Sequence, residues 1–288
     1  MVTFTFEALL SVGPLAYMTG ITDLDIREQG GNFVLYSASG ASGGVTSFNL
    51  TGAGAQFLDQ ESYGTGYLQA TPGQLEELSV GSGSALVTLG WHGSTLQSFD
   101  LATNGSFSGT GTVTTPGGFG APLVALEQVT LDSGNFLYAS RSGVDGLTIF
   151  QNDGSGQLVQ LTHQGGATQP LGADVIALEA VSVGSQNFLI TASAYNSHVV
   201  SYRIGNDGVL TEMTCLGAEN GLGIAAPSAM IEAEIGGTQY VVVAAAGSGS
   251  LSVLQVTSAG GLVLTDHVLD NLTSRFDGVS ALETITIG

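Results

Sequence analysis

The chain has 288 residues, 24 acidic side chains, four arginines and no lysine, which gives a net charge of −20 at pH 7. This charge argues against nucleic acid and anionic membrane surfaces as partners, because both bind through cationic side chains. The single cysteine, Cys215, excludes an internal disulfide. No run of 18 apolar residues is present, so we expect no membrane span.

A segment of similar sequence recurs five times along the chain. The third residue of each copy gives the spacing: Phe33, Ala85, Phe136, Phe188 and Tyr240 lie 52, 51, 52 and 52 residues apart. A period of this length is typical of repeat architectures. Glycine is abundant, with 44 residues, as expected for short strands that are joined by tight turns.

Each repeat divides into four apolar runs, most clearly in the fourth repeat. Its runs are Leu178–Val183, Phe188–Ala192, Val199–Ile204 and Val209–Cys215, and the last two are joined by the hairpin sequence GNDG. Four antiparallel strands every 52 or so residues predict the blades of an all-β propeller. A linear solenoid is the alternative. Blades packed on both faces would explain why many runs are apolar at most positions.

The two ends of the sequence resemble parts of a further blade. The segment Val279–Ile287 matches a first strand, and Thr3–Leu10 matches a fourth strand. We therefore expect a single domain over residues 1–288, with five complete blades between residues 22 and 276 and a partial closing blade. The missing strands would come from a continuation beyond Gly288 or from a neighbouring chain; an open or irregular closing blade is the alternative.

The stretch Asn135–Leu161 (NFLYASRSGVDGLTIFQNDGSGQLVQL) resembles the blades of lactonase-type propellers, and the pattern returns in the fourth and fifth repeats. This resemblance implies the fold rather than the activity. The whole chain is also similar to propeller regions that precede calcium-binding repeats in secreted bacterial proteins of the RTX type. That similarity implies an extracellular or cell-surface location. We see no N-terminal signal peptide.

One carboxylate recurs in the first strand of every repeat and again near the end of the chain. The six residues are Asp25, Glu76, Glu127, Glu179, Glu232 and Glu283, at spacings of 51, 51, 52, 53 and 51. First strands border the central channel of a propeller, so these side chains are expected to form a ring at one depth. Carboxylate oxygens suit a hard cation, and Ca²⁺ is the candidate.

Two other interpretations of the ring stay open. Each carboxylate could accept hydrogen bonds from backbone N–H groups of the next blade and fasten one blade to another. Alternatively, the ring could take part in catalysis. Glu179 lies on the same face of its expected strand as Val181 and Val183, so we expect it to point toward packed protein.

The remaining polar candidates carry weaker signals. The histidines His92, His163, His198 and His267 show no zinc-binding spacing and are expected in turns or outer strands. Arg141 and Asp145 share one loop and are expected to pair on the surface, or to contact a ligand at the channel mouth. Trp91, His92 and Tyr195 lie in equivalent loops, where they could stack on a sugar.

Together these features predict a non-catalytic binding or scaffold module of a larger acidic, secreted bacterial protein, with a protein or carbohydrate partner. A lactonase-like hydrolase with its site at the channel mouth is one alternative. A structural component of an extracellular assembly is the other. No residue is assigned a catalytic role.

Overall fold

The computed structural model describes residues 15–51, 54–63, 74–80, 83–89, 95–152, 155, 157–165, 175–271 and 276–285. Strands make up most of these residues, in five antiparallel sheets of four strands each. In every sheet the strands follow one another in sequence order, so each sheet is a meander that one repeat builds by itself.

The strand bounds follow the predicted runs closely. Blade 1 contains β1 (Ile21–Gln29), β2 (Asn32–Ser39), β3 (Gly44–Thr51) and β4 (Gly54–Ser62). Blade 2 contains β5 (Leu75–Val80), β6 (Gly83–Thr88), β7 (Thr95–Leu101) and β8 (Phe107–Thr114). Blade 3 contains β9 (Leu123–Leu131), β10 (Gly134–Arg141), β11 (Val144–Asn152) and β12 (Leu158–Gln164). Blade 4 contains β13 (Val175–Val183), β14 (Gln186–Ser193), β15 (His198–Ile204) and β16 (Leu210–Leu216). Blade 5 contains β17 (Pro227–Ile235), β18 (Thr238–Ala245), β19 (Ser250–Val256) and β20 (Leu262–Leu269).

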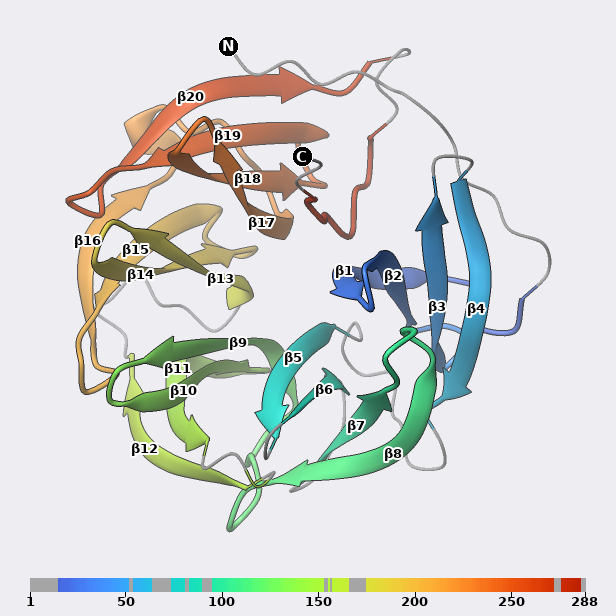
Figure 1. Ribbon diagram of the computed structural model, residues 1–288. Helices are drawn as coiled ribbons and strands as arrows, with labels where there is room; N and C mark the ends of the chain where they lie inside the picture. The colour runs from blue at the N-terminus through green and yellow to red at the C-terminus, as the bar shows by residue number, and fades with distance from the viewer. Residues whose placement is uncertain are drawn as a thin grey trace.

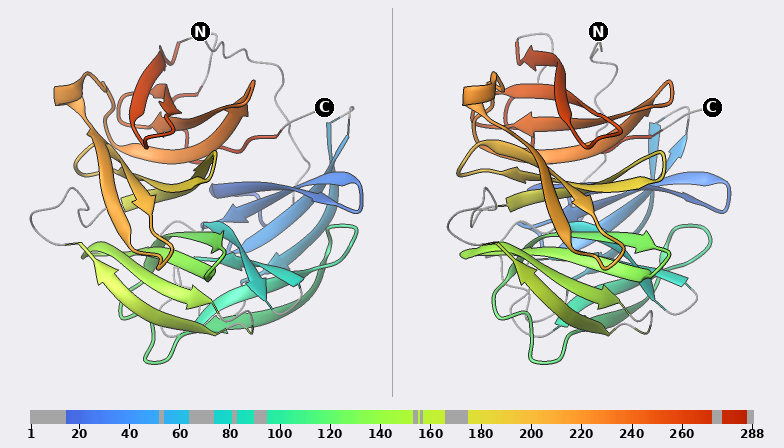
Figure 2. Two further views of the ribbon diagram at one scale, coloured as in Figure 1. Left: turned by 60° about the vertical axis from the view of Figure 1, so that its left-hand side comes forward. Right: turned by 90° about the vertical axis from the view of Figure 1, so that its left-hand side faces the viewer.

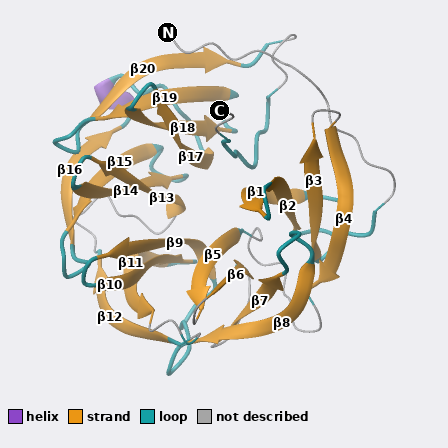
Figure 3. Cartoon of the chain, viewed as in Figure 1, coloured by secondary structure: helices purple, strands orange, loops and turns teal. Residues whose placement is uncertain are grey.

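The five blades surround a common axis, with β1, β5, β9, β13 and β17 nearest the centre (Figure 1). Seen from the side, the blades are twisted sheets (Figure 2). Within the described residues, the single helical element is a 3-10 turn at Ala218–Asn220 (Figure 3), and no helix there is long and apolar enough to cross a membrane. The prediction of a propeller is confirmed, and the linear solenoid is wrong.

The last described residues lie between blade 5 and blade 1, near the label C in Figure 1. We call residues 276–285 the closing segment. Its place agrees with the expected first strand of a closing blade, but no strand is assigned in it. The expected outer strand, Thr3–Leu10, lies outside the described residues. A partial sixth blade is therefore still a prediction.

The hydrophobic core lies between the blades. One cluster fills each contact between consecutive blades, from blades 1 and 2 to blades 4 and 5, and a small fifth cluster joins blade 5 to the closing segment. In β10, Phe136 and Tyr138 pack toward blade 4, whereas Leu137 and Ala139 pack toward blade 2. Because both faces of a strand are buried in this way, its apolar residues do not alternate with polar ones.

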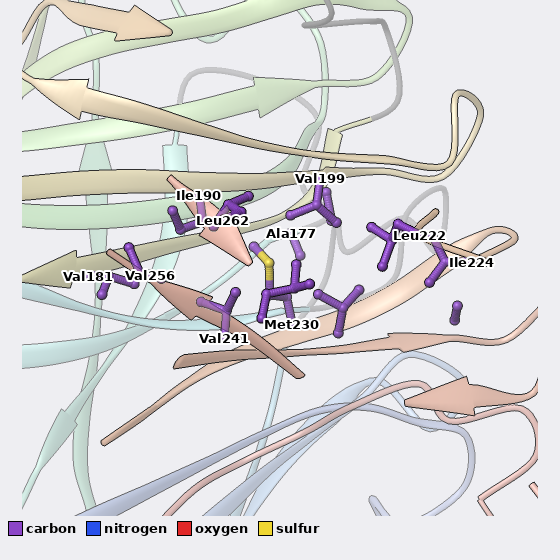
Figure 4. Packing of buried hydrophobic residues seen from close by; sticks show 14 of the residues in the cluster. Ala177, Val181, Ile190, Val199, Leu222, Ile224, Met230, Val241, Val256 and Leu262 are labelled. Atoms are coloured by element: carbon purple, nitrogen blue, oxygen red, sulfur yellow. The ribbon is translucent and has the colours of Figure 1, made fainter. Parts of the chain in front are cut away.

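The contact between blades 4 and 5 shows how this packing is made. Val199 of β15 and Ile190 of β14 meet Met230 of β17 and Val241 of β18 (Figure 4), and all four residues are at most 5% exposed. Leu222 and Ile224, from the connection between β16 and β17, extend the same cluster. Burial of apolar side chains from two sheets in one interface ties neighbouring repeats together.

Hairpin glycines add a second contact between neighbouring blades. The turn between the third and fourth strands places Gly105, Gly208 and Gly260 against the second strand of the preceding blade. The carbonyl of Gly208 accepts a hydrogen bond of 2.9 Å from the Tyr138 hydroxyl, and Gly105 does the same for Tyr36. Each of these glycines has a φ near +80°, which other residues adopt only with strain.

Gly208 should tolerate a side chain less well than Gly184. A Cβ at Gly208 would lie 2.5 Å from Cδ1 of the buried Phe136, whereas a Cβ at Gly184 meets nothing within 4 Å, although Gly184 also has a positive φ of 65°. We expect Gly184→Ala to lower the free energy of unfolding by about 1–2 kcal/mol through strain alone. Gly208→Ala should cost about 1–3 kcal/mol more, because it also overpacks the interface. Urea unfolding measures both, and equal losses would contradict this account of the turn.

Candidate functional site

A cavity of about 530 Å³ occupies the centre of the ring. The innermost strands of all five blades line it, together with the closing segment. Its charged lining residues are seven carboxylates and one arginine: Asp23, Asp25, Glu76, Glu77, Glu127, Glu179, Glu283 and Arg27. The lining is thus rich in acidic residues, and no described histidine or cysteine is part of it.

Five of the six carboxylates in the expected ring line this cavity. Glu232 lies in β17 at the corresponding repeat position but is not part of the lining. The recurrence at about 51 residues therefore predicted which side chains meet at the channel. It did not predict that one member would stand outside the cavity.

Backbone N–H groups of the next blade bind most of these carboxylates. The N–H of Gln128 in blade 3 donates to Oε1 of Glu76 in blade 2, at 3.2 Å. In the same way Ala180 donates to Glu127, and Glu232 donates to Glu179. The carboxylate of Glu283 accepts from Ile26 in blade 1. These bonds agree with the interpretation that the ring fastens each blade to the following one.

In blade 1, a carboxylate at a different position of the repeat accepts the backbone N–H of the next blade. The shorter Asp25 is bound by its neighbour Arg27, with 2.5 Å between Nη2 and Oδ2, and Arg27 also pairs with Glu77 of blade 2. The contact with the backbone of blade 2 comes from Asp23, whose Oδ2 accepts the N–H of Leu75 at 2.8 Å. The spacing pattern singled out Asp25 and missed Asp23, Arg27 and Glu77, because these three have no counterparts in the other repeats.

A further polar contact crosses the ring between blades that are not neighbours. Nε2 of Gln74, just before β5, donates to the carbonyl of Ile176 in β13 at 2.9 Å. Both residues lie at the beginning of an innermost strand, so this bond spans one end of the channel. No repeat pattern indicates this bond, since glutamine at position 74 does not recur at the corresponding positions of the other repeats.

Burial and mutual repulsion raise the pKa values of the lining carboxyl groups. Burial raises the pKa of Asp23 to about 7, against hydrogen bonds from the Leu75 and Leu24 N–H groups that lower it. Burial and then the Asp25 charge raise the pKa of Glu283 to about 8. The pKa values of Glu76, Glu127 and Glu179 are raised well above the usual range by burial first and by neighbouring glutamates second.

No three His, Cys, Asp or Glu side chains within the described ranges lie close enough together to hold one metal ion. The carboxylates are instead spread around the cavity wall, each within range to affect the pKa of others. Carboxylate oxygens fit a hard cation such as Ca²⁺ by their chemistry. Such an ion would have to keep water molecules among its ligands.

The other candidate residues lie away from the cavity. His163 in β12 and His267 in β20 bind Thr148 and Ser252 of the adjacent strand, and His198 begins β15 and contacts Glu219 at 3.1 Å. Tyr195 is 84% exposed in the turn before β15. Trp91 and His92 lie outside the described residues.

The expected surface pair of Arg141 and Asp145 is wrong. Nη1 of Arg141 instead donates to the carbonyl of Phe119 at 2.9 Å, in the glycine-rich turn before β9. Among the described ion pairs, neither residue takes part. Arg141 therefore holds a loop in place rather than lining the cavity.

Solved propellers share this architecture. A protein from Lactobacillus plantarum is 19% identical over 86% of this chain and 71% of its own, with a TM-score of 0.55. A putative 6-phosphogluconolactonase from Bacteroides fragilis is 14% identical over 86% and 70%, with a TM-score of 0.55. The periplasmic gluconolactonase PpgL of Pseudomonas aeruginosa is 14% identical over 86% and 85%, with a TM-score of 0.54.

No protein-family model matches the chain, and neither does any curated protein. At identities below 20% the solved structures establish a shared fold and not a shared activity. The resemblance to lactonase-type propellers is thus confirmed at the level of the fold. The similarity to RTX-associated propellers is not tested by these structures.

The raised pKa values predict that stability falls as the pH rises. A carboxyl group whose pKa is higher in the folded protein than in the unfolded chain stabilises the fold fully below its unfolded pKa, near 4. This contribution is lost as the pH rises through the folded pKa, about 7 for Asp23 and about 8 for Glu283. Urea unfolding in calcium-free buffer should therefore show that the free energy of unfolding falls by on the order of 2 kcal/mol between pH 5 and pH 9. This figure is reduced to allow for screening by solvent, because the groups are partly exposed. A profile that is flat, or that rises over this range, would contradict the assignment.

Replacement of Arg27 should lower the free energy of unfolding more than replacement of Arg203. Arg27→Met leaves Asp25 and Glu77 without their cation, and the side chains of Arg27 and Asp25 are only 13% and 17% exposed. We expect a loss of about 2–4 kcal/mol in the free energy of unfolding. The exposed Arg203, in β15, has no described ion pair, and Arg203→Met should change stability by less than about 0.5 kcal/mol. Equal effects in the two variants would show that Arg27 has no special role.

Proposed function

We propose that the chain is a non-catalytic binding module whose central cavity takes up cations, with Ca²⁺ as the candidate ion. The observation that carries this proposal is the composition of the wall: seven carboxylates and one arginine surround about 530 Å³. Like charges in a partly enclosed site repel each other more strongly than they would in water. Either protons or a cation must offset that repulsion.

The donor set favours a hard, hydrated ion over a transition metal. The described lining offers carboxylate oxygens, serine hydroxyls and the amides of Gln74 and Gln128, but no imidazole or thiolate. The proposed ligands are the lining members of the ring, Asp25, Glu76, Glu127, Glu179 and Glu283. Because no three of the described acidic groups converge on one point, the ion would bridge pairs of carboxylates through water, with modest affinity.

Calcium binding should be visible as a pH-dependent stabilisation. At pH 8, where more of the carboxyl groups are ionised, CaCl₂ should raise the thermal midpoint, because a ligand that binds only the folded state stabilises it. Glu127→Gln combined with Glu179→Gln should remove most of this shift. Glu212→Gln, on the exposed face of β16, serves as the matched control and should retain it.

Isothermal titration calorimetry on the same three proteins provides the second readout, with NaCl at matched ionic strength as the reference salt. Heat of Ca²⁺ binding in the wild type and in Glu212→Gln, but not in the double variant, would support the proposal. No calcium-specific shift in the wild type, or an equal shift in all three proteins, would overturn it.

A lactonase-like hydrolase is the second candidate, because solved neighbours of the fold carry gluconolactonase names. A carboxyl group with a pKa near 7, such as Asp23, suits general acid or base catalysis at neutral pH. The negative wall disfavours phosphorylated substrates, so a neutral sugar lactone is the better candidate.

A panel of neutral and phosphorylated sugar lactones tests this second candidate. Turnover of a neutral lactone that falls at least about a hundredfold in Asp23→Asn would establish the hydrolase and set the non-catalytic proposal aside. Hydrolysis at the uncatalysed rate for the whole panel would remove the hydrolase. In either case the Asp23→Asn protein must retain the wild-type circular dichroism spectrum.

The proposed location and partners of the protein are inferred from its composition. The absence of lysine and the excess of acidic residues suit a module of a secreted, calcium-dependent bacterial protein at the cell surface or outside the cell, with a protein or carbohydrate partner. Strands from a continuation of the polypeptide, or from a neighbouring chain in an extracellular assembly, would complete the closing blade.

A further inference from the structure

One side of the cavity wall carries a cation of its own. Arg27 of β1 is the one arginine among the described lining residues, and its side chain is only 13% exposed. Its Nε and Nη2 atoms each lie 2.5 Å from Oδ2 of Asp25, and its Nη1 atom pairs with Glu77 of blade 2. The guanidinium group thus joins carboxylates of two neighbouring blades.

Arg27 and Glu77 are both exceptions to the repeat. Arg27 comes two residues after the recurrent carboxylate, and the next three blades have buried apolar residues at that position: Leu78, Val129 and Val181. Glu77 comes one residue after the recurrent carboxylate, and the blades that follow have uncharged residues there: Gln128, Ala180 and Ala233. The two exceptions are therefore partners, one on each side of the contact between blades 1 and 2.

Strand geometry explains why Glu77 can reach the guanidinium group. Successive residues of a strand point to opposite faces, so Glu76 and Glu77 face different neighbours. Glu76 accepts the backbone N–H of Gln128 in blade 3, whereas Glu77 faces Arg27 in blade 1. We call Arg27, Asp25 and Glu77 the charged triad. Its two carboxylates outnumber its one cation, so the triad stays negative even with Arg27 in place.

The side of the wall that belongs to blades 3 and 4 is different. Glu127 and Glu179 line the cavity there, and neither belongs to an ion pair within the described part of the chain. Burial first, and then the charges of Glu179 and Glu232, raise the pKa of Glu127. Burial and the charge of Glu127 also raise the pKa of Glu76, but there Arg27 lowers it. The positive field of Arg27 thus acts on the side of blades 1 and 2.

We infer that Arg27 is the resident cation of the channel and determines where a diffusible cation can bind. It occupies the carboxylates of the charged triad in blades 1 and 2. A cation from solution is therefore directed to Glu127 and Glu179 in blades 3 and 4, a step that rests on the proposed function. A guanidinium group suits the triad because its fork of donors can bind two carboxylates at once, whereas an ammonium group is a single charged centre.

Chemical rescue tests the resident cation. Arg27→Ala removes the side chain beyond Cβ, and ethylguanidinium supplies the atoms that are lost. At about 20 mM this probe should raise the thermal midpoint of Arg27→Ala by about 2 °C or more relative to NaCl of equal ionic strength, because it binds the folded state. Ethylammonium has the same charge without the fork and should raise the midpoint by less than about half as much.

Arg203→Ala, at an exposed arginine of β15, is the matched control for the rescue. This variant and the wild type should show no shift that is specific to ethylguanidinium. Equal shifts of Arg27→Ala with the two organic cations, or equal shifts with ethylguanidinium in Arg27→Ala and Arg203→Ala, would overturn the inference.

Calcium titration of Arg27→Gln tests the effect on a diffusible cation. Glutamine removes the charge but fills part of the space and can still bind Asp25 by a hydrogen bond. Because the triad then lacks its cation, Ca²⁺ should bind at least about fivefold more tightly than in the wild type, measured by isothermal titration calorimetry at pH 8. Arg203→Gln should leave the affinity within about twofold. If Arg27 only fastened the blades, Arg27→Gln would lower the thermal midpoint without tighter calcium binding, and that result would overturn the inference.

The two experiments distinguish failure of this inference from failure of the proposed function. Rescue of Arg27→Ala by ethylguanidinium, in a protein that shows no calcium shift, would support the resident cation and contradict calcium uptake. A calcium shift in the wild type, with no rescue of Arg27→Ala and no gain in Arg27→Gln, would do the reverse. If Arg27→Ala does not fold, the calcium affinity of Arg27→Gln decides, and the absence of a gain overturns the inference.

Discussion

The arrangement depends on carboxylates that fasten the blades together while repelling one another across the channel. Glu76, Glu127 and Glu179 each accept a backbone N–H from the following blade, and each lies in the field of other acidic groups. Hydrogen bonds to the charged form favour ionisation, whereas burial and like charges oppose it. Because the pKa values are raised, burial and like charges outweigh the hydrogen bonds to the charged form. In the proposed function, a cation would compete with protons for these same oxygens.

The apolar interfaces between blades allow the ring to tolerate this repulsion. Blades 2, 3 and 4 bury both faces against their neighbours. Hairpin glycines such as Gly208 bring the next turn close enough to accept a hydrogen bond from the preceding blade. These contacts lie away from the charged axis. A variant that weakens an interface should thus change stability at every pH, whereas a variant of the channel should change it in a pH-dependent way.

The repeat period predicted most of the fold and five of the seven carboxylates that line the cavity. Residues that recur every 51 to 53 positions, such as Glu127 and Glu179, could be placed in one ring because equivalent positions in a propeller face the same axis. Asp23 and Arg27 could not, because neither has a counterpart in the other repeats: Asp23 accepts the N–H of Leu75, and Arg27 pairs with Asp25. Arg141 was misassigned because its partner is a backbone carbonyl, which leaves no trace in a pattern of side chains.

The most direct test of this account is the number of protons that the protein takes up on folding at pH 7, measured by calorimetry in buffers of different ionisation enthalpy. The account predicts that the calcium-free folded state binds at least about one proton more than the unfolded chain, and that Ca²⁺ displaces it. A folded state that binds the same number of protons or fewer would contradict the claim that buried, mutually repelling carboxylates form the centre of this ring.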